Sequence, residues 1–227
     1  MTTMTFSELW QKFRLLQSPE SLSEAERAIM EKFLQEEHRA REKRRLAHLL
    51  KMSGLARPRR LEEFDWTFNP KIPREKILEY VQTEFLQRPS NLVLVGAAGV
   101  GKTHLASALC YQAVQQGQLT VFTTLYDFTA KLAKARNVYH MIDYYAKVPV
   151  LCLDELGYVV PPKDQADALF QIISKRNETK TTIVTTNLIP SQWGKVFDGV
   201  TASAILDRLT MNGRFIILEG KSYRSKR

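Results

Sequence analysis

A glycine-rich stretch near the middle of the chain ends in a lysine and a threonine. Gly96, Gly99 and Gly101 are followed by Lys102 and Thr103, in the pattern G-x-x-x-x-G-K-T. Glycines let a loop curl until successive backbone N–H groups converge on phosphate oxygens, and a helix N-terminus adds the positive end of its dipole. Lys102 would then reach the β- and γ-phosphates of a nucleotide, and the Thr103 hydroxyl would hold Mg²⁺. The alternative is a glycine-rich turn that matches this pattern by chance.

The residues on either side of this stretch predict the elements that position it. Residues 91–95 favour a strand, and apolar residues resume at helical spacing from Leu105 to Leu109. Strand, loop and helix in this order are the context in which the pattern binds phosphate. We therefore expect nucleotide contacts from Gly96, Ala97, Ala98, Gly99, Val100, Gly101, Lys102, Thr103 and His104.

A second apolar run, residues 148–155, ends in two carboxylates, Asp154 and Glu155. Such a run fits a strand buried on both faces of a parallel sheet, and ligands of open α/β sheets bind at the carboxyl ends of strands. We expect Asp154 to ligate Mg²⁺ through water and Glu155 to orient and deprotonate an attacking water. An acidic helix cap that follows a strand is the alternative.

Two further polar residues could contribute to the same chemistry. Asn187 follows a predicted strand at 181–186 and could bind the water or the γ-phosphate, with a turn-forming asparagine as the alternative. Arg208 lies on a predicted helix that directs Ala204, Ile205 and Leu209 inward. In an oligomeric nucleotidase such an arginine can stabilise charge at the neighbour's γ-phosphate, whereas a solvated or ion-paired surface residue is the plainer interpretation.

Five predicted strands, at 91–95, 119–124, 148–155, 181–186 and 214–219, alternate with helices, including one at 126–145. This alternation favours a mostly parallel sheet covered on both faces. Before the first strand, Phe64, Trp66 and Phe68 alternate as in an edge strand, ahead of a helix from Pro73. These aromatic side chains could form the wall of an adenine pocket or simply pack in the core.

The N-terminal sixty residues form a separate, basic, helical segment. A helix at 6–16 can fold back on a longer one that starts at the capping box of Ser23 and Glu26 and ends before Gly54. The chain carries a formal charge of +9, and residues 39–60 hold nine basic residues against one acidic residue. This concentration indicates a polyanion partner whose phosphate backbone it contacts, unless it is a solvated helix face. Candidate DNA contacts are Arg39, Arg41, Lys43, Arg44, Arg45 and Lys51, with a second group at Lys131, Lys134 and Arg136.

The composition argues against several other classes of protein. No apolar run approaches the ~20 residues that span a bilayer, and the N-terminus lacks an export signal, so we expect a cytoplasmic protein with no membrane partner. Cys110 and Cys152 lack the spacing of a metal site or a disulfide framework and are expected to be small buried apolar residues.

The segments GAAGVGKTHLASAL, LCLDELGY, IVTTN, SQWGKVF, SAILDRL and GKSYR, in this order, resemble the IstB/DnaC-like AAA+ ATPases. Within them the chain is most similar to IstB, the helper ATPase encoded beside the transposase of certain insertion sequences. The resemblance covers residues 61–227 and is weaker before residue 60. It divides the chain into an N-terminal domain, 1–60, and an ATPase domain, 61–227.

The resemblance implies an α/β AAA+ P-loop fold with a five-stranded parallel sheet flanked by helices, and no C-terminal lid domain. It also implies ATP and Mg²⁺ as cofactors, ATP-dependent homo-oligomers on double-stranded DNA, and an IstA-type transposase as partner. Residues 96–103 become the Walker A loop, Asp154 and Glu155 the Walker B pair, Asn187 the first sensor and Arg208 an arginine finger acting in trans. Eight residues follow Glu219, too few for a helical lid, so Arg224 is a substitute candidate for the second sensor.

Three functions fit these features. The first is a transposition helper that assembles on duplex DNA, and the second is a DnaC-like replicative helicase loader that touches single strands. The third is a non-catalytic, nucleotide-dependent scaffold, which the intact Lys102, Thr103, Asp154 and Glu155 disfavour. The sequence motifs of the ATPase domain and the basic segment at 39–60 favour the transposition helper.

Overall fold

The computed structural model describes residues 4–226, which divide into two compact units between His48 and Leu49. Each unit has a hydrophobic core of its own. The sequence predicted a division near residue 60, but residues 49–60 group with the larger unit. The reason is packing, because Leu55 is buried in the core of that unit and the Phe122 N–H donates to the Ser53 carbonyl at 2.7 Å.

The smaller unit is a pair of helices that pack together through a small cluster of apolar side chains. Helix α1 (Phe6–Lys12) packs its aromatic side chains on Leu34 of α2 (Glu24–Met52), which continues past the division. The capping box is present, since the Ser23 N–H donates to the Glu26 carboxylate at 2.8 Å and the Glu26 N–H to the Ser23 hydroxyl at 3.4 Å.

Helix α1 is shorter than predicted and ends at Lys12, not at Leu16. The chain turns there, and the Trp10 Nε1–H donates to the Gln17 carbonyl at 2.8 Å. Leu16 lies exposed on the turn that follows. The apolar pattern therefore extended beyond the helix that it predicted.

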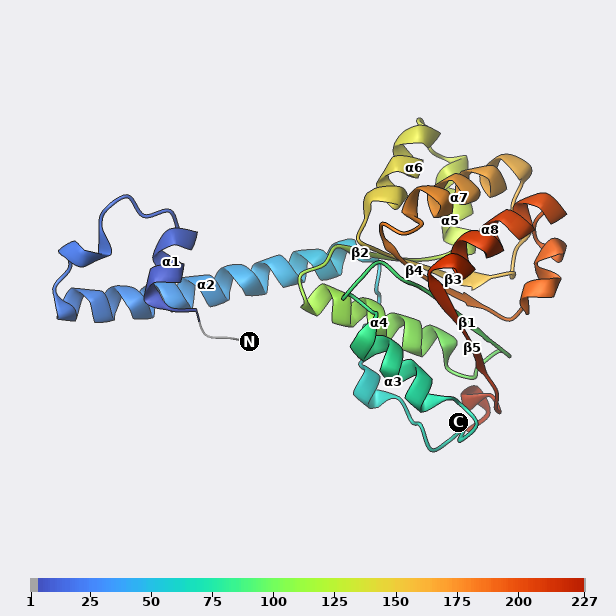
Figure 1. The fold of residues 1–227 in the computed structure, drawn as a ribbon, viewed down its shortest axis with the longest axis horizontal. Coiled ribbons are helices and arrows are strands. Elements are labelled where there is room, and N and C mark those ends of the chain that lie inside the picture. The colour runs from blue at the N-terminus through green and yellow to red at the C-terminus, as the bar shows by residue number, and fades with distance from the viewer. Residues whose placement is uncertain (1–3, 227) are drawn as a thin grey trace. The chain divides into compact units, whose positions relative to one another are not determined.

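The larger unit is built on a five-stranded parallel sheet, as predicted (Figure 1). Its strands are β1 (Asn91–Gly96), β2 (Thr120–Thr124), β3 (Val150–Leu156), β4 (Thr181–Thr186) and β5 (Gly213–Leu218). They lie in the order β2-β3-β4-β1-β5, and every neighbouring pair is parallel. The carboxyl ends of β3, β4 and β1 therefore lie side by side at one edge of the sheet.

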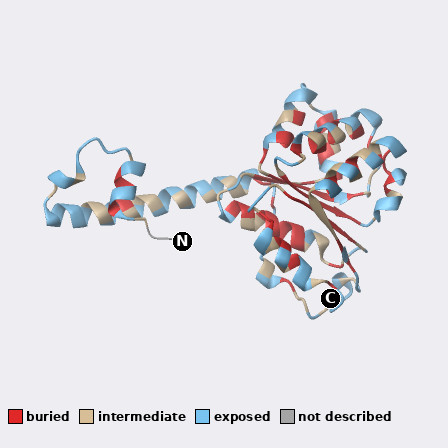
Figure 2. Cartoon of the chain, in the orientation of Figure 1, coloured by how far each residue is buried: buried red, intermediate tan, exposed pale blue. Residues whose placement is uncertain are grey.

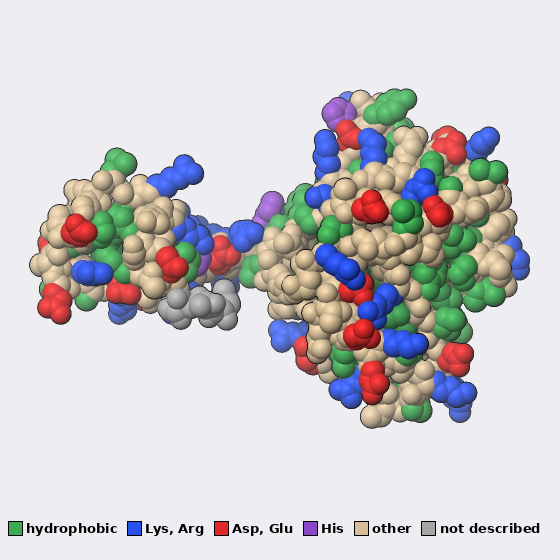
Figure 3. All heavy atoms as spheres, viewed as in Figure 1, with side chains coloured by type: hydrophobic (Ala, Val, Ile, Leu, Met, Phe, Trp, Pro, Cys, Tyr) green, Lys and Arg blue, Asp and Glu red, His purple; other side chains and the backbone are tan. Residues whose placement is uncertain are grey.

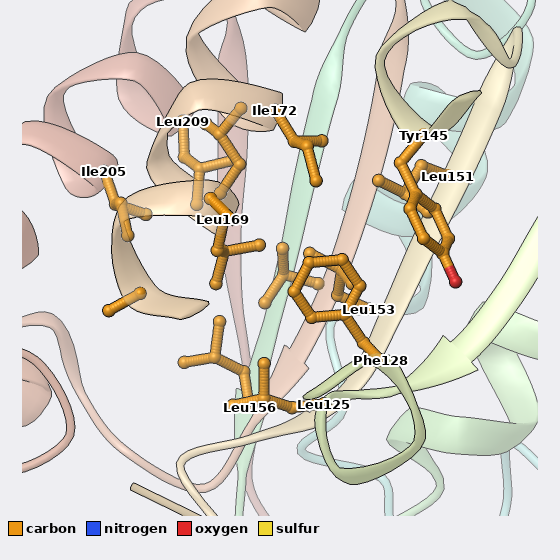
Figure 4. Packing of buried hydrophobic residues seen from close by; sticks show 14 of the residues in the cluster. Leu125, Phe128, Tyr145, Leu151, Leu153, Leu156, Leu169, Ile172, Ile205 and Leu209 are labelled. Atoms are coloured by element: carbon orange, nitrogen blue, oxygen red, sulfur yellow. The ribbon is translucent and has the colours of Figure 1, made fainter. Parts of the chain in front are cut away.

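Helices cover both faces of this sheet. Helices α3 (Arg74–Thr83) and α4 (Lys102–Gln115) lie on one face, and α5 (Leu125–Ala133), α6 (Val138–Lys147), α7 (Lys163–Arg176) and α8 (Gly199–Met211) lie on the other (Figure 1). Burial is concentrated in the strands and in the helix sides that face them (Figure 2). Figure 4 shows Leu125 and Phe128 of α5, Tyr145 of α6, Leu169 and Ile172 of α7 and Ile205 and Leu209 of α8 around Leu151 and Leu153 of β3.

The single helix predicted at 126–145 is wrong, because this stretch holds two helices. Helix α5 ends at Ala133, and Asn137 starts α6 by accepting the His140 N–H at 3.1 Å. On α8, Ile205 and Leu209 are buried as predicted, whereas Ala204 is half-buried and Ala202 takes the inward position.

The strand-like edge predicted at Phe64, Trp66 and Phe68 is also wrong. A short 3₁₀-helix, Leu61–Glu63, leads into a turn in which the Asp65 carboxylate accepts the N–H groups of Thr67 and Phe68 at 3.1 and 3.2 Å. The local hydrogen bonds of an aspartate therefore replace those of a strand.

Within residues 4–226, no helix combines the length and the apolar character that crossing a membrane requires. Cys110 and Cys152 are buried free thiols, as expected of small apolar residues.

Candidate functional site

The loop after β1 has the backbone that the glycine pattern predicted. Gly99 and Gly101 lie in the left-handed region, with φ of 79° and 109°, and Gly101 caps α4. A Cβ at Gly101 would lie 2.6 Å from the Phe64 ring, and one at Gly99 would lie 2.0 Å from the Ser222 hydroxyl oxygen. Both the backbone conformation and the available space therefore require glycine at these two positions. The loop leads directly into the N-terminus of α4, where backbone N–H groups can bind an anion.

Lys102 lies in the first turn of α4, with its ammonium group against the loop. Its Nζ donates to the carbonyls of Gly96 and Ala97 at 2.8 and 2.9 Å. Burial lowers the pKa of this ammonium, the charges of Asp154 and Glu155 oppose that shift, and the nearby charge of Arg224 adds to it. Lys102 is thus a half-buried cation beside two carboxylates.

Asp154 is buried, and its Oδ1 accepts hydrogen bonds from two hydroxyl groups. The Thr103 hydroxyl donates to Oδ1 at 3.1 Å, and the Thr185 hydroxyl donates to the same atom. A carboxylate and a hydroxyl supply the hard oxygen ligands that Mg²⁺ prefers. The two predicted metal ligands, from α4 and β3, are therefore brought together, and their chemistry fits the ion.

Glu155 follows on β3 and is exposed to the cavity described below. Its backbone is left-handed, with a φ of 59°, and its N–H donates to the Thr185 hydroxyl at 3.0 Å. Non-glycine residues rarely adopt this conformation, and such backbone strain clusters at functional sites.

A cavity of about 950 Å³ adjoins most of these residues, although Gly96, Ala97 and Asp154 are not among those that line it. Glu155 and Asn187 line it, as do residues 98–104 of the loop and α4. Its volume is at the upper end of the range of small-molecule sites, roughly 300–1,000 Å³. The glycine loop, Lys102 and the Thr103 hydroxyl that bonds to Asp154 therefore face a space that can hold a nucleotide.

Arg208 is not among the residues that line this cavity in the part of the chain that the structure describes. Its side chain pairs with Asp207 on the surface of α8, and its carbonyl accepts from the Asn91 side chain at 3.1 Å. The structure thus separates Arg208 from the other predicted catalytic residues of the same chain.

The predicted aromatic wall is present in part. Phe64 and Phe68 line the cavity, whereas Trp66 packs on Phe64 and on the Arg74 guanidinium without lining it. The His104 ring lies nearly perpendicular to the Phe64 ring, with centroids 5.3 Å apart, and its Nε2 lies 3.3 Å from the Arg60 carbonyl. Burial lowers the pKa of the His104 imidazole.

The C-terminal segment forms one side of the cavity. From this segment the sequence had indicated only Arg224 as a site residue. The Tyr223 N–H donates to the Gly99 carbonyl at 2.9 Å, and the Tyr223 ring lies edge-on to Phe68. Buried Asn69 binds both the N–H and the carbonyl of Lys221 at 2.9 Å. Tyr223 and Arg224 line the cavity.

Thr185 and Asn69 are functional candidates that sequence analysis missed. A polar run, Thr185 to Asn187, directly after Ile183 and Val184 was the available signal for Thr185. Asn69 had none, because its partner lies 152 residues along the chain.

The candidate DNA contacts are exposed but lie in both units. Arg39, Arg41, Lys43, Arg44 and Arg45 are exposed on α2 in the smaller unit, where Figure 3 shows Lys and Arg side chains along the helix. Arg41 pairs with Glu37 at 2.6 Å and Arg45 with Glu42 at 3.3 Å, so part of this charge is neutralised. In the larger unit, the exposed candidates are Lys51, at the end of α2, and Lys131, Lys134 and Arg136, around the end of α5.

Comparison with known proteins places these features in a family. A family model described as IstB-like ATP binding protein matches residues 7–227. An ATP-binding protein of insertion sequence IS21 from Pseudomonas aeruginosa is 37% identical over 197 residues, which cover 85% of this chain and 74% of that protein. One of insertion sequence IS5376 from Geobacillus stearothermophilus is 31% identical over 222 residues, covering 96% and 88%.

Solved structures share the fold at lower identity. DnaI matches with a TM-score of 0.62 at 23% identity, over 74% of this chain and 90% of that one. AMPPCP-bound DnaA from Aquifex aeolicus matches with a TM-score of 0.62 at 20% identity, over 77% and 54%. The chain therefore belongs to the IstB-like ATP binding protein family and has the α/β fold of the AAA+ P-loop ATPases.

Proposed function

We propose that this protein is a Mg²⁺-dependent ATPase that assembles on duplex DNA with ATP and delivers the DNA to a partner transposase. The observation that carries the proposal is the convergence of Lys102, Thr103 and Glu155 on one cavity, with buried Asp154 bonded to the Thr103 hydroxyl behind it. The relatives named for insertion sequences support the transposition context. Because ATP and DNA are its proposed ligands, we place the protein in the cytoplasm.

The cavity residues divide the chemistry of ATP hydrolysis among them. The loop N–H groups and Lys102 bind the phosphates, and Thr103 and Asp154 would hold Mg²⁺, which supplies positive charge at the β- and γ-phosphates. Glu155 accepts a proton from the attacking water as its oxygen bonds to the γ-phosphorus. The bond from that phosphorus to the β–γ bridging oxygen breaks, and ADP leaves with the electron pair. Asn187 orients the water or the γ-phosphate.

Arg208 completes the site of a neighbouring subunit in this proposal. It lies outside the cavity of its own chain, on the surface of α8, as a finger acting in trans requires. Its guanidinium would offset the charge that develops on the neighbour's γ-phosphate. ATP between subunits then stabilises a homo-oligomer, and hydrolysis weakens it.

Assembly would line up basic surfaces along the phosphate backbone. The exposed cations of α2 and those around the end of α5 are the proposed contacts to DNA phosphates. Such contacts increase affinity for DNA but do not select a base sequence. Binding should therefore fall steeply as salt rises.

Fluorescence anisotropy of labelled duplex and single-stranded DNA of equal length tests the proposal. The protein is titrated with ATP, ADP or no nucleotide at two salt concentrations. Tight, cooperative, ATP-dependent and salt-sensitive binding to duplex supports the transposition helper. Preference for single strands would favour a helicase loader, and indifference to nucleotide would contradict the proposed switch.

A further inference from the structure

One buried threonine connects the two acidic residues of the site. Thr185 is fully buried on β4, which pairs with β3 on one side and β1 on the other. Its hydroxyl donates to Asp154 Oδ1 and accepts the Glu155 N–H at 3.0 Å. A single hydroxyl group therefore donates a hydrogen bond to the Asp154 side chain and accepts one from the Glu155 backbone.

The pairing of β3 and β4 explains why this bridge is needed. Leu153 pairs with Val184 and Leu156 with Thr186, so two residues of β3, Asp154 and Glu155, lie opposite Thr185 alone. This is a β-bulge, a device that redirects a side chain and leaves part of the ladder without regular partners. The Thr185 side chain supplies the acceptor for the displaced Glu155 N–H.

The bulge also accounts for the directions of the two carboxylates. Asp154 remains buried beside Thr103, whereas Glu155, with its left-handed backbone, is exposed to the cavity. In a regular strand successive side chains alternate between faces, and the left-handed residue changes the course of the chain at this point. The bond to Thr185 holds the backbone in this disfavoured conformation.

The polar run at the end of β4 therefore has separate tasks. The Thr186 hydroxyl accepts the Leu188 N–H at 3.0 Å and closes the turn after the strand. Asn187 is the exposed member of the run, and all three residues line the cavity. Thr185 alone of these three bonds to both Asp154 and Glu155 among the contacts of residues 4–226.

We propose that Thr185 is a positioning residue for ATP hydrolysis, which sets the Asp154 carboxylate toward Mg²⁺ and the Glu155 carboxylate toward the attacking water. The inference rests on the proposed ATPase function and deepens it. Thr185 acts through these two residues, so its removal should lower turnover more than it lowers nucleotide affinity.

The test compares Thr185→Val, which keeps the shape of the side chain and removes the hydroxyl, with Thr185→Ser, which keeps the hydroxyl. Thr120→Val is the matched control, because Thr120 is a buried threonine at the amino end of β2 that bonds to a loop carbonyl. DNA-stimulated kcat and KM, the ATP dissociation constant and the Mg²⁺ dependence are measured for each variant of the full chain.

For Thr185→Val we expect kcat to fall at least about tenfold and the Mg²⁺ requirement to rise, while ATP affinity changes less than about threefold. Thr185→Ser and Thr120→Val should stay within about threefold of wild-type kcat. If Thr185→Val melts below the assay temperature, Thr185→Ala is measured against the same expectations.

Equal kcat in wild type and Thr185→Val would overturn the inference, as would equal losses in the valine and serine variants. Parallel losses of kcat and ATP affinity would also overturn it, since they indicate a general structural role. A wild-type protein that turns over no ATP on any DNA would instead contradict the proposed function. The two failures are therefore distinguishable.

Discussion

Two cations, Arg176 and Lys102, both donate to backbone carbonyls at opposite ends of the sheet's strands. Arg176 lies at the amino ends and Lys102 at the carboxyl ends. Arg176, at the end of α7, is fully buried and binds the carbonyls of Tyr145 and Val148 at 2.7 Å and the Thr182 hydroxyl at 3.0 Å. Lys102 is half-buried, lines the cavity, and donates to two carbonyls of one loop. One cation is enclosed by oxygens, and the other lies beside a space for a ligand.

This difference separates a structural cation from a functional one. Burial lowers the pKa of the Arg176 guanidinium to about 9, so it still carries its charge at neutral pH, and its bonds tie α6 and α7 to the amino ends of β3 and β4. Lys102 interacts with the charges of Asp154, Glu155 and Arg224 around the cavity. Exposure to a cavity, more than the number of hydrogen bonds, therefore distinguishes Lys102 as the cation that we propose to bind phosphate.

A third cation, Arg208, lies outside the cavity of its own chain and should give the largest effect, because we propose that it offsets the charge on a neighbouring subunit's γ-phosphate. Arg208→Ala should keep ATP binding and lower the hydrolysis rate by about a thousandfold or more, the range of arginine fingers. Steady-state ATPase assays and ATP titrations measure both quantities.

Mixing variants tests whether Arg208 acts in trans. A mixture of Arg208→Ala with Glu155→Gln should regain activity, because one variant supplies the intact cavity and the other the arginine. Wild-type turnover in Arg208→Ala alone, or a mixture as inactive as its components, would contradict the assignment.

Arg176→Met should destabilise the fold by about 3–5 kcal/mol, since it leaves several buried carbonyls without a donor. Urea unfolding at pH 7 measures this free energy. Lys102→Ala serves as the comparison and should lose less than about 1 kcal/mol. Similar losses in both variants would remove the distinction between the two cations.

Lys102→Ala should weaken ATP binding at least about tenfold while the protein stays folded, because a charge-assisted contact to the phosphates is lost. The same change should abolish ATP-dependent assembly. Lys195→Ala, at an exposed lysine outside the cavity lining, is the control and should bind ATP as wild type does. Unchanged ATP affinity in Lys102→Ala would exclude the loop from the mechanism.

His104 should give the smallest effect, and it depends on pH. Burial lowers the pKa of its imidazole, so the unfolded chain binds a proton more readily than the folded one. Stability should therefore fall as pH falls below the unfolded pKa of about 6.5. Tm measured between pH 7 and 5.5 should decline more in wild type than in His104→Gln, and parallel declines would contradict this assignment.

The sequence was sufficient to predict elements whose signal is local. The strand before Gly96, the helix after Thr103 and the paired carboxylates at 154–155 each follow from a short pattern, and all three are present. Strand order was beyond such patterns, because it depends on pairing between distant segments. The break in the helix predicted at 126–145 was missed, because the cap at Asn137 interrupts a continuous apolar pattern.

The candidate site shows the same limit. The polar run at 185–187 marks the end of a strand, but the role of Thr185 follows from its partners about thirty residues away on β3. Asn69 is recognisable only through its contacts with the C-terminal segment. The residues proposed to touch substrate were predictable from the chemistry of their types and spacing. Residues that position them depend on a bulge and on a long-range contact, neither of which has a signature in a single sequence.

The most direct test of the account is the lifetime of protein–duplex complexes, followed by mass photometry, after ATP and Mg²⁺ are added. The account predicts multimeric complexes that require ATP, dissociate as wild type consumes it, and persist in Glu155→Gln. Complexes that form equally with ADP, or that decay at the same rate in Glu155→Gln as in wild type, would contradict it.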